Sequence, residues 1–239
     1  MENYQNKTQI MKTTAIVCAY NEEKTIQGVM DSLLQSTALD EIIAVDDGSK
    51  DRTAALLRKY QHIERVRVIL LPENSGKGYA MTSAACQANG EVLVFVDADL
   101  KNLTPEHITL LLEPIHRSEI RMVVGVPVRG EVISRAERLD PCRSLSGQRV
   151  VYRDDFLFLQ NAIRHSGYGV ETILNLHYRE QGKPVKFIYL PFLYHPIKVE
   201  KAGFGTALGE YWHEGKQIMQ TAIRNPKLIW GALFSVLDR

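Results

Sequence analysis

Runs of apolar residues alternate with helix-forming stretches through the first half of the chain. Four short runs read as buried strands, and apolar residues recur near helical spacing in the segments that follow them. The strand-like runs cover residues 13–18, 41–47, 66–71 and 91–97, and the helical patterns cover 22–35, 48–60, 79–88 and 106–116. Continuous apolar strands separated by helices are typical of a parallel sheet with helices on both faces. The sequence therefore predicts an α/β fold.

The pattern loosens after a fifth apolar run at residues 121–128. Residues 130–156 are charged and poor in periodicity, so we expect a long irregular segment there, of the kind that is usually functional or disordered. The elements expected beyond it are a helix before the stretch HSGYGVE (165–171), a helix at 172–181, a strand at 185–196, and helices at 206–223 and 227–238. No repeat, low-complexity tract or linker divides the chain, which indicates one domain over residues 1–239 with a C-terminal helical extension.

Composition narrows the classes of protein. The 239 residues carry a net charge of +1, so no overall field attracts nucleic acid. No apolar run is long enough for a spanning helix, and residues 1–12 lack the apolar core of a secretory signal. We therefore expect a cytoplasmic protein. Three widely spaced cysteines predict neither a disulfide framework nor a zinc site.

Polar residues follow each of the first four strands, and the carboxyl ends of such strands form the ligand-binding edge of an open α/β sheet. The clusters are Tyr20-Asn21-Glu22, Asp46-Asp47-Gly48-Ser49, Asn74-Ser75-Gly76-Lys77-Gly78 and Asp97-Ala98-Asp99. Any one of them is weak evidence, because polar loops follow most strands. All four together predict one shared binding site.

Each cluster suits a particular task. Asp97 and Asp99 point the same way in an extended chain and are hard oxygen ligands suited to Mg²⁺ or Mn²⁺. Asp46 or Asp47 is placed to accept hydrogen bonds from a base or a ribose, and Lys77 offers a charge to phosphate. Each task has a structural alternative. Asp97 and Asp99 could serve only as a helix cap and a turn, and Lys77 could be a solvated lysine in the first turn of a helix.

The motifs AYNEE, VDDGSKDRT, NSGKGYA and VFVDADL, in this order and spacing, resemble the family 2 glycosyltransferases with a GT-A fold. The dolichyl-phosphate mannosyltransferase and glucosyl-3-phosphoglycerate synthase branches are the most similar. The resemblance is firm over residues 13–127, which would be the nucleotide-sugar-binding half, and weaker over 128–239, the acceptor side. A QxxRW motif, present in many processive members, is absent here, which disfavours a long-chain polysaccharide synthase.

The resemblance implies a nucleotide-diphosphate sugar donor linked to UDP or GDP, a divalent metal, and transfer to a small molecule or a polyprenyl or other lipid phosphate. The metal ligands would be Asp97, Asp99 and His195, the last of which has a packed core histidine as its alternative. The implied donor contacts are Ala19, Tyr20, Asn21, Glu22, Asp46, Asp47, Gly48, Lys77, Asp97, Ala98 and Lys198.

Two residues of the second half are candidates for catalysis. Glu171 is either the general base of an inverting transfer or a residue that orients the acceptor, and the structural alternative is a carboxylate favoured in a first helical turn. Arg149 with Gln148 is placed to clamp an acceptor phosphate, a task for which Arg129 competes. The sequence leaves inversion and retention both open.

The last helical segment, 227–238, carries enough apolar residues to pack in the core or in a homodimer interface. The alternative is a helix that makes peripheral contact with a membrane.

Two rival functions remain. A nucleotidyltransferase should carry a glycine-rich basic loop after the first strand, where this chain has CAYNEE. A non-catalytic module would bind the sugar nucleotide without turnover.

Overall fold

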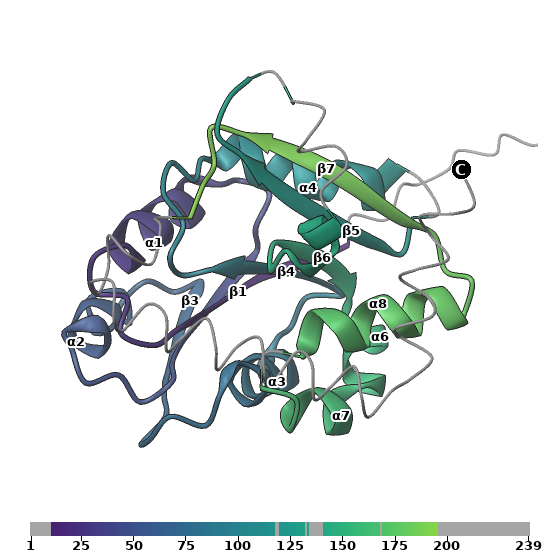
Figure 1. Ribbon diagram of the computed structural model, residues 1–239. Coiled ribbons are helices and arrows are strands. Elements are labelled where there is room, and N and C mark those ends of the chain that lie inside the picture. Colours follow the sequence, from purple (N-terminus) through teal and green to yellow (C-terminus); the bar gives the residue numbers. More distant parts are fainter. Residues whose placement is uncertain (1–10, 118–119, 132, 134–140, 168, 196–239) are drawn as a thin grey trace, which may run out of the picture.

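The computed structural model describes residues 11–117, 120–131, 133, 141–167 and 169–195. Its strands form one sheet in the order β3-β2-β1-β4-β6-β5-β7, with helices on both faces (Figure 1). The strands are β1 Thr13–Ala19, β2 Glu41–Asp46, β3 Val66–Leu70, β4 Val92–Asp97, β5 Met122–Val128, β6 Arg149–Tyr152 and β7 Val185–Pro191. Neighbouring strands are parallel except at β6, which runs antiparallel to β4 and β5. The predicted mostly parallel α/β sheet is confirmed.

Two hydrophobic cores lie on opposite faces of this sheet. The helices on the first face are α1 Ile26–Gln35, α2 Thr53–Arg58 and α4 Pro105–Arg117, and those on the second are α3 Lys77–Gln87, α6 Arg153–Phe158, α7 Gln160–Arg164 and α8 Val170–Glu180. Strand β4 shows how the sequence serves both. Val94 and Val96 pack into the first core while Leu93 and Phe95 pack into the second, because successive side chains of a strand point to opposite faces.

The expectation of an irregular segment over residues 130–156 is wrong at its C-terminal end. A short 3₁₀ helix, η1, spans Pro141–Leu145, and β6 and α6 follow. Strand β6 has only four residues, too few to show a period, and it is stabilised by pairing with β4 and β5 on its two sides. The tertiary contacts of these residues, rather than their local pattern, make them a strand.

The strand order reverses next to β1. Strands β2 and β3 lie on one side of β1 and β4 lies on the other, and all four are parallel. At the carboxyl end of β1, Ala19 pairs with Asp46 of β2, and Cys18 pairs with Asp97 of β4. The loops after these strands therefore open at the same edge of the sheet, where open α/β folds bind ligands.

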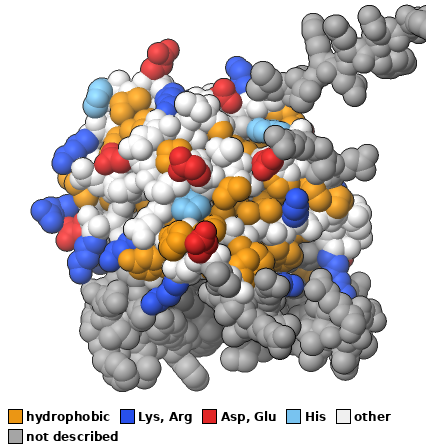
Figure 2. Space-filling view, turned by 90° about the horizontal axis from the view of Figure 1, so that it is seen from above, with side chains coloured by type: hydrophobic (Ala, Val, Ile, Leu, Met, Phe, Trp, Pro, Cys, Tyr) orange, Lys and Arg blue, Asp and Glu red, His pale blue; other side chains and the backbone are white. Residues whose placement is uncertain are grey.

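Parts of the prediction fall outside the described residues, namely the helices expected at 206–223 and 227–238. The single-domain organisation stays a prediction. None of the helices within the described ranges has both the length and the apolar character needed to cross a membrane. Acidic and basic side chains both occur among hydrophobic ones on the face seen in Figure 2, so charge of one sign does not dominate it.

Candidate functional site

Asp97, Asp99 and His195 meet at the carboxyl edge of the sheet. Asp97 ends β4, and His195 follows β7, which is separated from β4 by β6 and β5 in the sheet order. His195 Nδ1 lies 2.8 Å from Asp99 Oδ1, and His195 Nε2 lies 3.9 Å from Asp97 Oδ2. One ligand atom from each of the three residues fits within a mutual distance of 4.8 Å. The structure therefore brings together the three residues predicted as metal ligands.

The segment after β7 is held against the loop that follows β4. Lys101 N donates to Tyr194 O at 2.9 Å in an isolated antiparallel bridge. His107, at the start of α4, contacts Pro191 O through Nε2 at 2.8 Å. A carbonyl can only accept, so this nitrogen carries the proton. Sequence reasoning assigned no role to His107, yet these contacts place His195 beside the acids.

Lys77 lies between two carboxylates. Its ammonium Nζ is 3.0 Å from Asp97 Oδ1 and 2.8 Å from Glu171 Oε1. Burial would lower the pKa of Lys77, but the charges of Asp97 and Glu171 outweigh it and raise the pKa above its usual value. Burial would likewise raise the pKa of Asp97, and the charges of Lys77 and His195 hold it below its usual value. The lysine is thus a fixed cation and Asp97 a fixed anion.

The chemistry of this cluster fits a divalent cation. Two carboxylates and an imidazole are ligands that Mg²⁺ or Mn²⁺ accepts. The side chains of Asp97, Asp99 and His195 are 20%, 26% and 39% exposed, so an ion can reach them. Burial would lower the pKa of His195, but its hydrogen bond to Asp99 and the nearby charge of Asp97 raise it. The negative charge that draws a proton to this ring would equally draw a metal ion.

The two aspartates after β2 differ in their partners. Asp47 accepts hydrogen bonds from Ser75 N at 2.8 Å and Gly76 N at 2.9 Å, so it holds the β3–α3 loop in place. Asp46 Oδ2 accepts from Ser49 N at 3.1 Å, whereas Asp46 Oδ1 is buried and has no hydrogen-bond partner among the described residues. A buried carboxylate oxygen without a partner is costly. Of the two, Asp46 therefore has the unused acceptor.

The loop after β1 is tied to the loop after β2. Asn21 has a positive φ of 57°, its N–H donates to Ser49 Oγ at 2.9 Å, and its side-chain Oδ1 accepts from Lys50 N at 2.8 Å. Glu22 N donates to Thr53 Oγ1 at 2.8 Å. The side chain of Asn21 thus acts as a clamp between the two loops.

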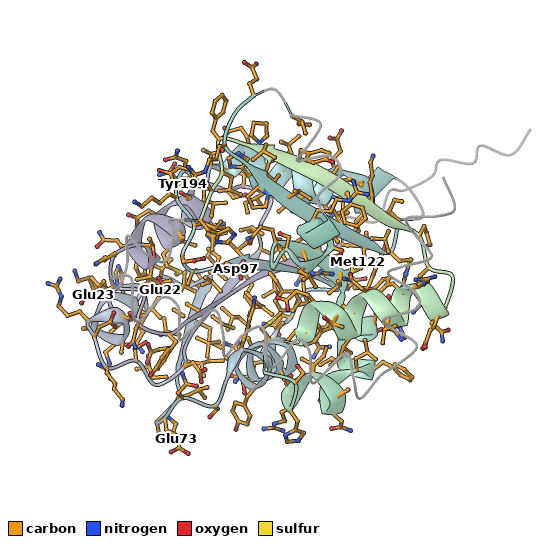
Figure 3. The ribbon with its side chains drawn as sticks, viewed as in Figure 1. Glu22, Glu23, Glu73, Asp97, Met122 and Tyr194 are labelled. Carbon is orange, nitrogen blue, oxygen red and sulfur yellow. The ribbon has the colours of Figure 1, made fainter. Side chains whose placement is uncertain are left out.

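The remaining predicted donor residues sit around this edge with different exposure. Tyr20 is exposed at 38%, whereas Ala19 and Ala98 are buried. Gly48 has a φ of +70°, and a Cβ there would lie 2.3 Å from the backbone carbon of Glu73, so only glycine allows this approach. Lys198 lies outside the described residues. Figure 3 shows Asp97 near the centre, with Glu22 toward α1.

Arg149 is not at the surface of this edge. Its side chain is 1% exposed, and its guanidinium donates to Asn175 Oδ1 at 2.8 Å, to Ser146 O at 2.9 Å and to Ser144 O. Burial lowers the pKa of Arg149 to about 10. These contacts tie η1 to β6 and α8. Its assignment to the acceptor stays a prediction, while the neighbouring Gln148 is the residue whose side chain reaches the acidic cluster.

Sequence comparison places the chain in a family. The sequence pattern of glycosyl transferase family 2 matches residues 14–169, more than half of the chain, and the chain belongs to this family. The predicted resemblance is confirmed.

Among curated relatives, it is 38% identical over 97 residues to dolichyl-phosphate beta-glucosyltransferase ALG5C of Trichomonas vaginalis, a match covering 36% of this chain and 29% of the relative. It is 35% identical over 111 residues to undecaprenyl-phosphate 4-deoxy-4-formamido-L-arabinose transferase of Photorhabdus laumondii, which covers 44% of this chain and 34% of the relative. The chain thus spans about a third of the length of these relatives.

Among solved structures, the fold resembles glucosyl-3-phosphoglycerate synthase from Mycobacterium tuberculosis in complex with Mn²⁺, uridine diphosphate and phosphoglyceric acid. The TM-score is 0.69 at 24% identity, and the match covers 90% of this chain and 78% of the synthase. At this identity the likeness speaks for the fold, and it agrees with the GT-A architecture predicted from the sequence.

Proposed function

We propose that this chain transfers a sugar from a UDP- or GDP-linked donor to a small-molecule or lipid-phosphate acceptor, with Mg²⁺ or Mn²⁺ at the site. The observation that carries the proposal is the cluster of Asp97, Asp99 and His195 at the carboxyl edge of the sheet, in a chain of glycosyl transferase family 2. The named relatives transfer sugars to dolichyl or undecaprenyl phosphate, and the related synthase binds Mn²⁺ with uridine diphosphate, which supports this class of donor and acceptor.

The reaction breaks the bond between the anomeric carbon and the diphosphate oxygen and forms a bond to an acceptor oxygen. Asp97, Asp99 and His195 would hold the cation, which neutralises charge on the leaving diphosphate when bound. Lys77 adds a second positive charge at the same place, since its ammonium is held 3.0 Å from Asp97 Oδ1. We assign Asp46 to the base of the nucleotide because its Oδ1 is a buried acceptor without a partner among the described residues.

Glu171 begins the acceptor side of the site. It lies in the first turn of α8, is 6% exposed, and its Oε1 accepts a hydrogen bond from Lys77. The contact supports two roles for Glu171, either taking the proton of an attacking hydroxyl or positioning Lys77 if the transfer needs no base. For the acceptor anion, exposed Arg129 is better placed than buried Arg149, since its guanidinium lies 5.7 Å from the ring centre of Tyr194, next to His195.

A panel of nucleotide sugars tests the proposal through metal-dependent binding and transfer. We expect the wild-type protein to bind UDP or GDP more tightly with Mn²⁺, and to release the nucleotide from the matching sugar donor. Asp99→Asn should abolish the metal dependence and keep the fold, as judged by thermal unfolding. Asp154→Asn is the matched control, because Asp154 is exposed and lies in the first turn of α6, outside the cluster.

The panel also distinguishes a glycosyltransferase from the alternative, a non-catalytic binding module. A protein that binds the donor with Mn²⁺ but transfers nothing to water, to phosphoglycerate or to polyprenyl phosphate would be a binding module. Metal dependence that survives Asp99→Asn would contradict the assigned cation site.

A further inference from the structure

Gln148 contacts Asp97 at two points. Asp97 N–H donates to Gln148 Oε1 at 3.0 Å, and Gln148 Nε2 donates to Asp97 Oδ2 at 2.8 Å. A backbone N–H can only donate, so the oxygen of the amide must face it, and this sets the orientation of the whole side chain. The amide nitrogen then necessarily points to the carboxylate. One glutamine therefore holds both the backbone and the side chain of the last residue of β4.

The same nitrogen also faces His195. Gln148 Nε2 lies 3.3 Å from His195 Nε2. An amide nitrogen donates and does not accept, so in the neutral ring, which is the form that binds a metal ion, His195 Nε2 must present its lone pair. The opposite ring nitrogen, Nδ1, then carries the proton and donates it to Asp99 Oδ1 at 2.8 Å. This arrangement leaves Nε2 as the nitrogen able to bind a cation. The contact between Gln148 Nε2 and His195 Nε2 is long, so it is weak and a bound cation can replace it.

The glutamine has little freedom to move. Gln148 is 1% exposed, and its backbone carbonyl accepts a hydrogen bond from Gly125 N of β5 at 2.8 Å. The residue before it, Gly147, lies so close to Asp97 that a Cβ would come within 2.3 Å of Asp97 Oδ2. Gly147 and Gln148, which directly precede β6, therefore both confine the Asp97 carboxylate.

We propose that Gln148 is a positioning residue of the cation site. Its side chain holds the Asp97 carboxylate and keeps the Nε2 lone pair of His195 turned toward the cation site. This inference rests on the proposed function, because it concerns the same cation. A neutral amide suits the position, because it donates to the Asp97 carboxylate and faces the His195 ring without adding a charge. Partners that orient the ligands of a metal typically change its affinity by about 10- to 100-fold when they are removed.

The first test needs no change at position 148. Nitrogen NMR of the metal-free, histidine-labelled protein at alkaline pH, where the ring is neutral, reports which ring nitrogen carries the proton. The resonances of His195 are identified by their loss in His195→Gln. We expect the proton on Nδ1. A proton on Nε2 overturns the proposal, because the amide of Gln148 could not then donate to that nitrogen.

The second test measures Mn²⁺ affinity without nucleotide, by the loss of the free-ion paramagnetic resonance signal. Gln148→Met keeps the length of the side chain and removes the amide. We expect the dissociation constant for Mn²⁺ to rise about tenfold or more. The control is Tyr178→Phe, which removes a buried hydroxyl contact to Asp155 outside the cluster and should leave Mn²⁺ affinity unchanged.

The outcomes separate the two proposals. Wild-type affinity in Gln148→Met, with the wild-type protein binding Mn²⁺, overturns the role of Gln148 and leaves the proposed function standing. A wild-type protein that binds no Mn²⁺ overturns the cation site on which both rest. A purely structural role would lower the unfolding temperature of Gln148→Met and of Tyr178→Phe alike, without the selective change in Mn²⁺ affinity. If Gln148→Met does not fold, the NMR experiment decides alone.

Discussion

Substituting Gly147 by alanine would test the geometry of the acidic cluster most directly. A Cβ at this position would lie 2.3 Å from Asp97 Oδ2, 2.4 Å from Oδ1 and 2.7 Å from Cγ. Gly147 is not among the glycines with positive φ, so its backbone accepts alanine without strain. The effect of the substitution is therefore steric, and it acts on the Asp97 carboxylate alone among the nearest contacts.

The size of the displacement follows from these distances. Ordinary contacts of carbon with heavy atoms begin near ~3.5 Å, so the carboxylate must move by about 1 Å. Its hydrogen bonds to Lys77 Nζ at 3.0 Å and to Gln148 Nε2 at 2.8 Å would then stretch beyond the usual range. We expect Gly147→Ala to lower the free energy of unfolding by about 1–3 kcal/mol, the usual cost of overpacking. Mn²⁺ affinity should fall by about tenfold or more.

The assay combines Mn²⁺ titration with urea unfolding, and Gly28→Ala is the control. Gly28 lies inside α1, and a Cβ there meets nothing within 4 Å. Alanine at this position should leave Mn²⁺ affinity unchanged and raise stability by up to about 1 kcal/mol, because glycine is a poor helix former. The reasoning is refuted if Gly147→Ala binds Mn²⁺ as tightly as the wild-type protein, since the carboxylate would then not be confined as described.

Three further predictions concern charged groups. Lys77→Met leaves two carboxylates without their ammonium, so nucleotide-diphosphate affinity and urea stability should both fall, the latter by about 2 kcal/mol; unchanged values would exclude the ion pairs. Glu171→Gln should reduce kcat by about 10² with donor affinity little altered. Near-normal turnover in this variant would show that Glu171 is not the base and only positions Lys77. Burial would raise the pKa of Asp155, but hydrogen bonds from Lys183 and Tyr178 hold it below its usual value. The unfolded carboxyl titrates near ~3.9, so this stabilisation is present above that pH and is lost as the pH falls through the lower folded pKa. Asp155→Asn should therefore unfold in less urea than wild type at pH 7, and a gap that does not narrow in acid would count against the linkage.

The fold class and the ligand-binding edge could be read from the sequence because both depend on local pattern. Apolar runs such as residues 91–97 bury both faces of a strand, and their helical connections require parallel neighbours. Polar residues directly after each run, such as Asp46 and Asp97, must then gather at the carboxyl edge. These inferences need only the periods of strands and helices and the known handedness of their connections.

Contacts between residues that are distant in the sequence could not be predicted from local pattern. His195 meets Asp99 through a bridge between Lys101 and Tyr194, and no periodicity reveals that contact. It was expected only by resemblance to the family. Strand β6 was missed because four residues carry no detectable pattern, and only β4 and β5 on its two sides make it a strand.

The difference between Gln148 and Arg149 shows what tertiary structure alone decided. The two residues are adjacent, and in an extended chain adjacent side chains point to opposite faces of the sheet. The sequence suggested an arginine clamp with the glutamine as its helper. In the structure, Gln148 faces Asp97 and His195, while Arg149 is buried against α8. A shift of one residue in the register of β6 would exchange these faces. The sequence thus determined which chemical groups the site contains, and the pairing of β6 determined which of them reach it.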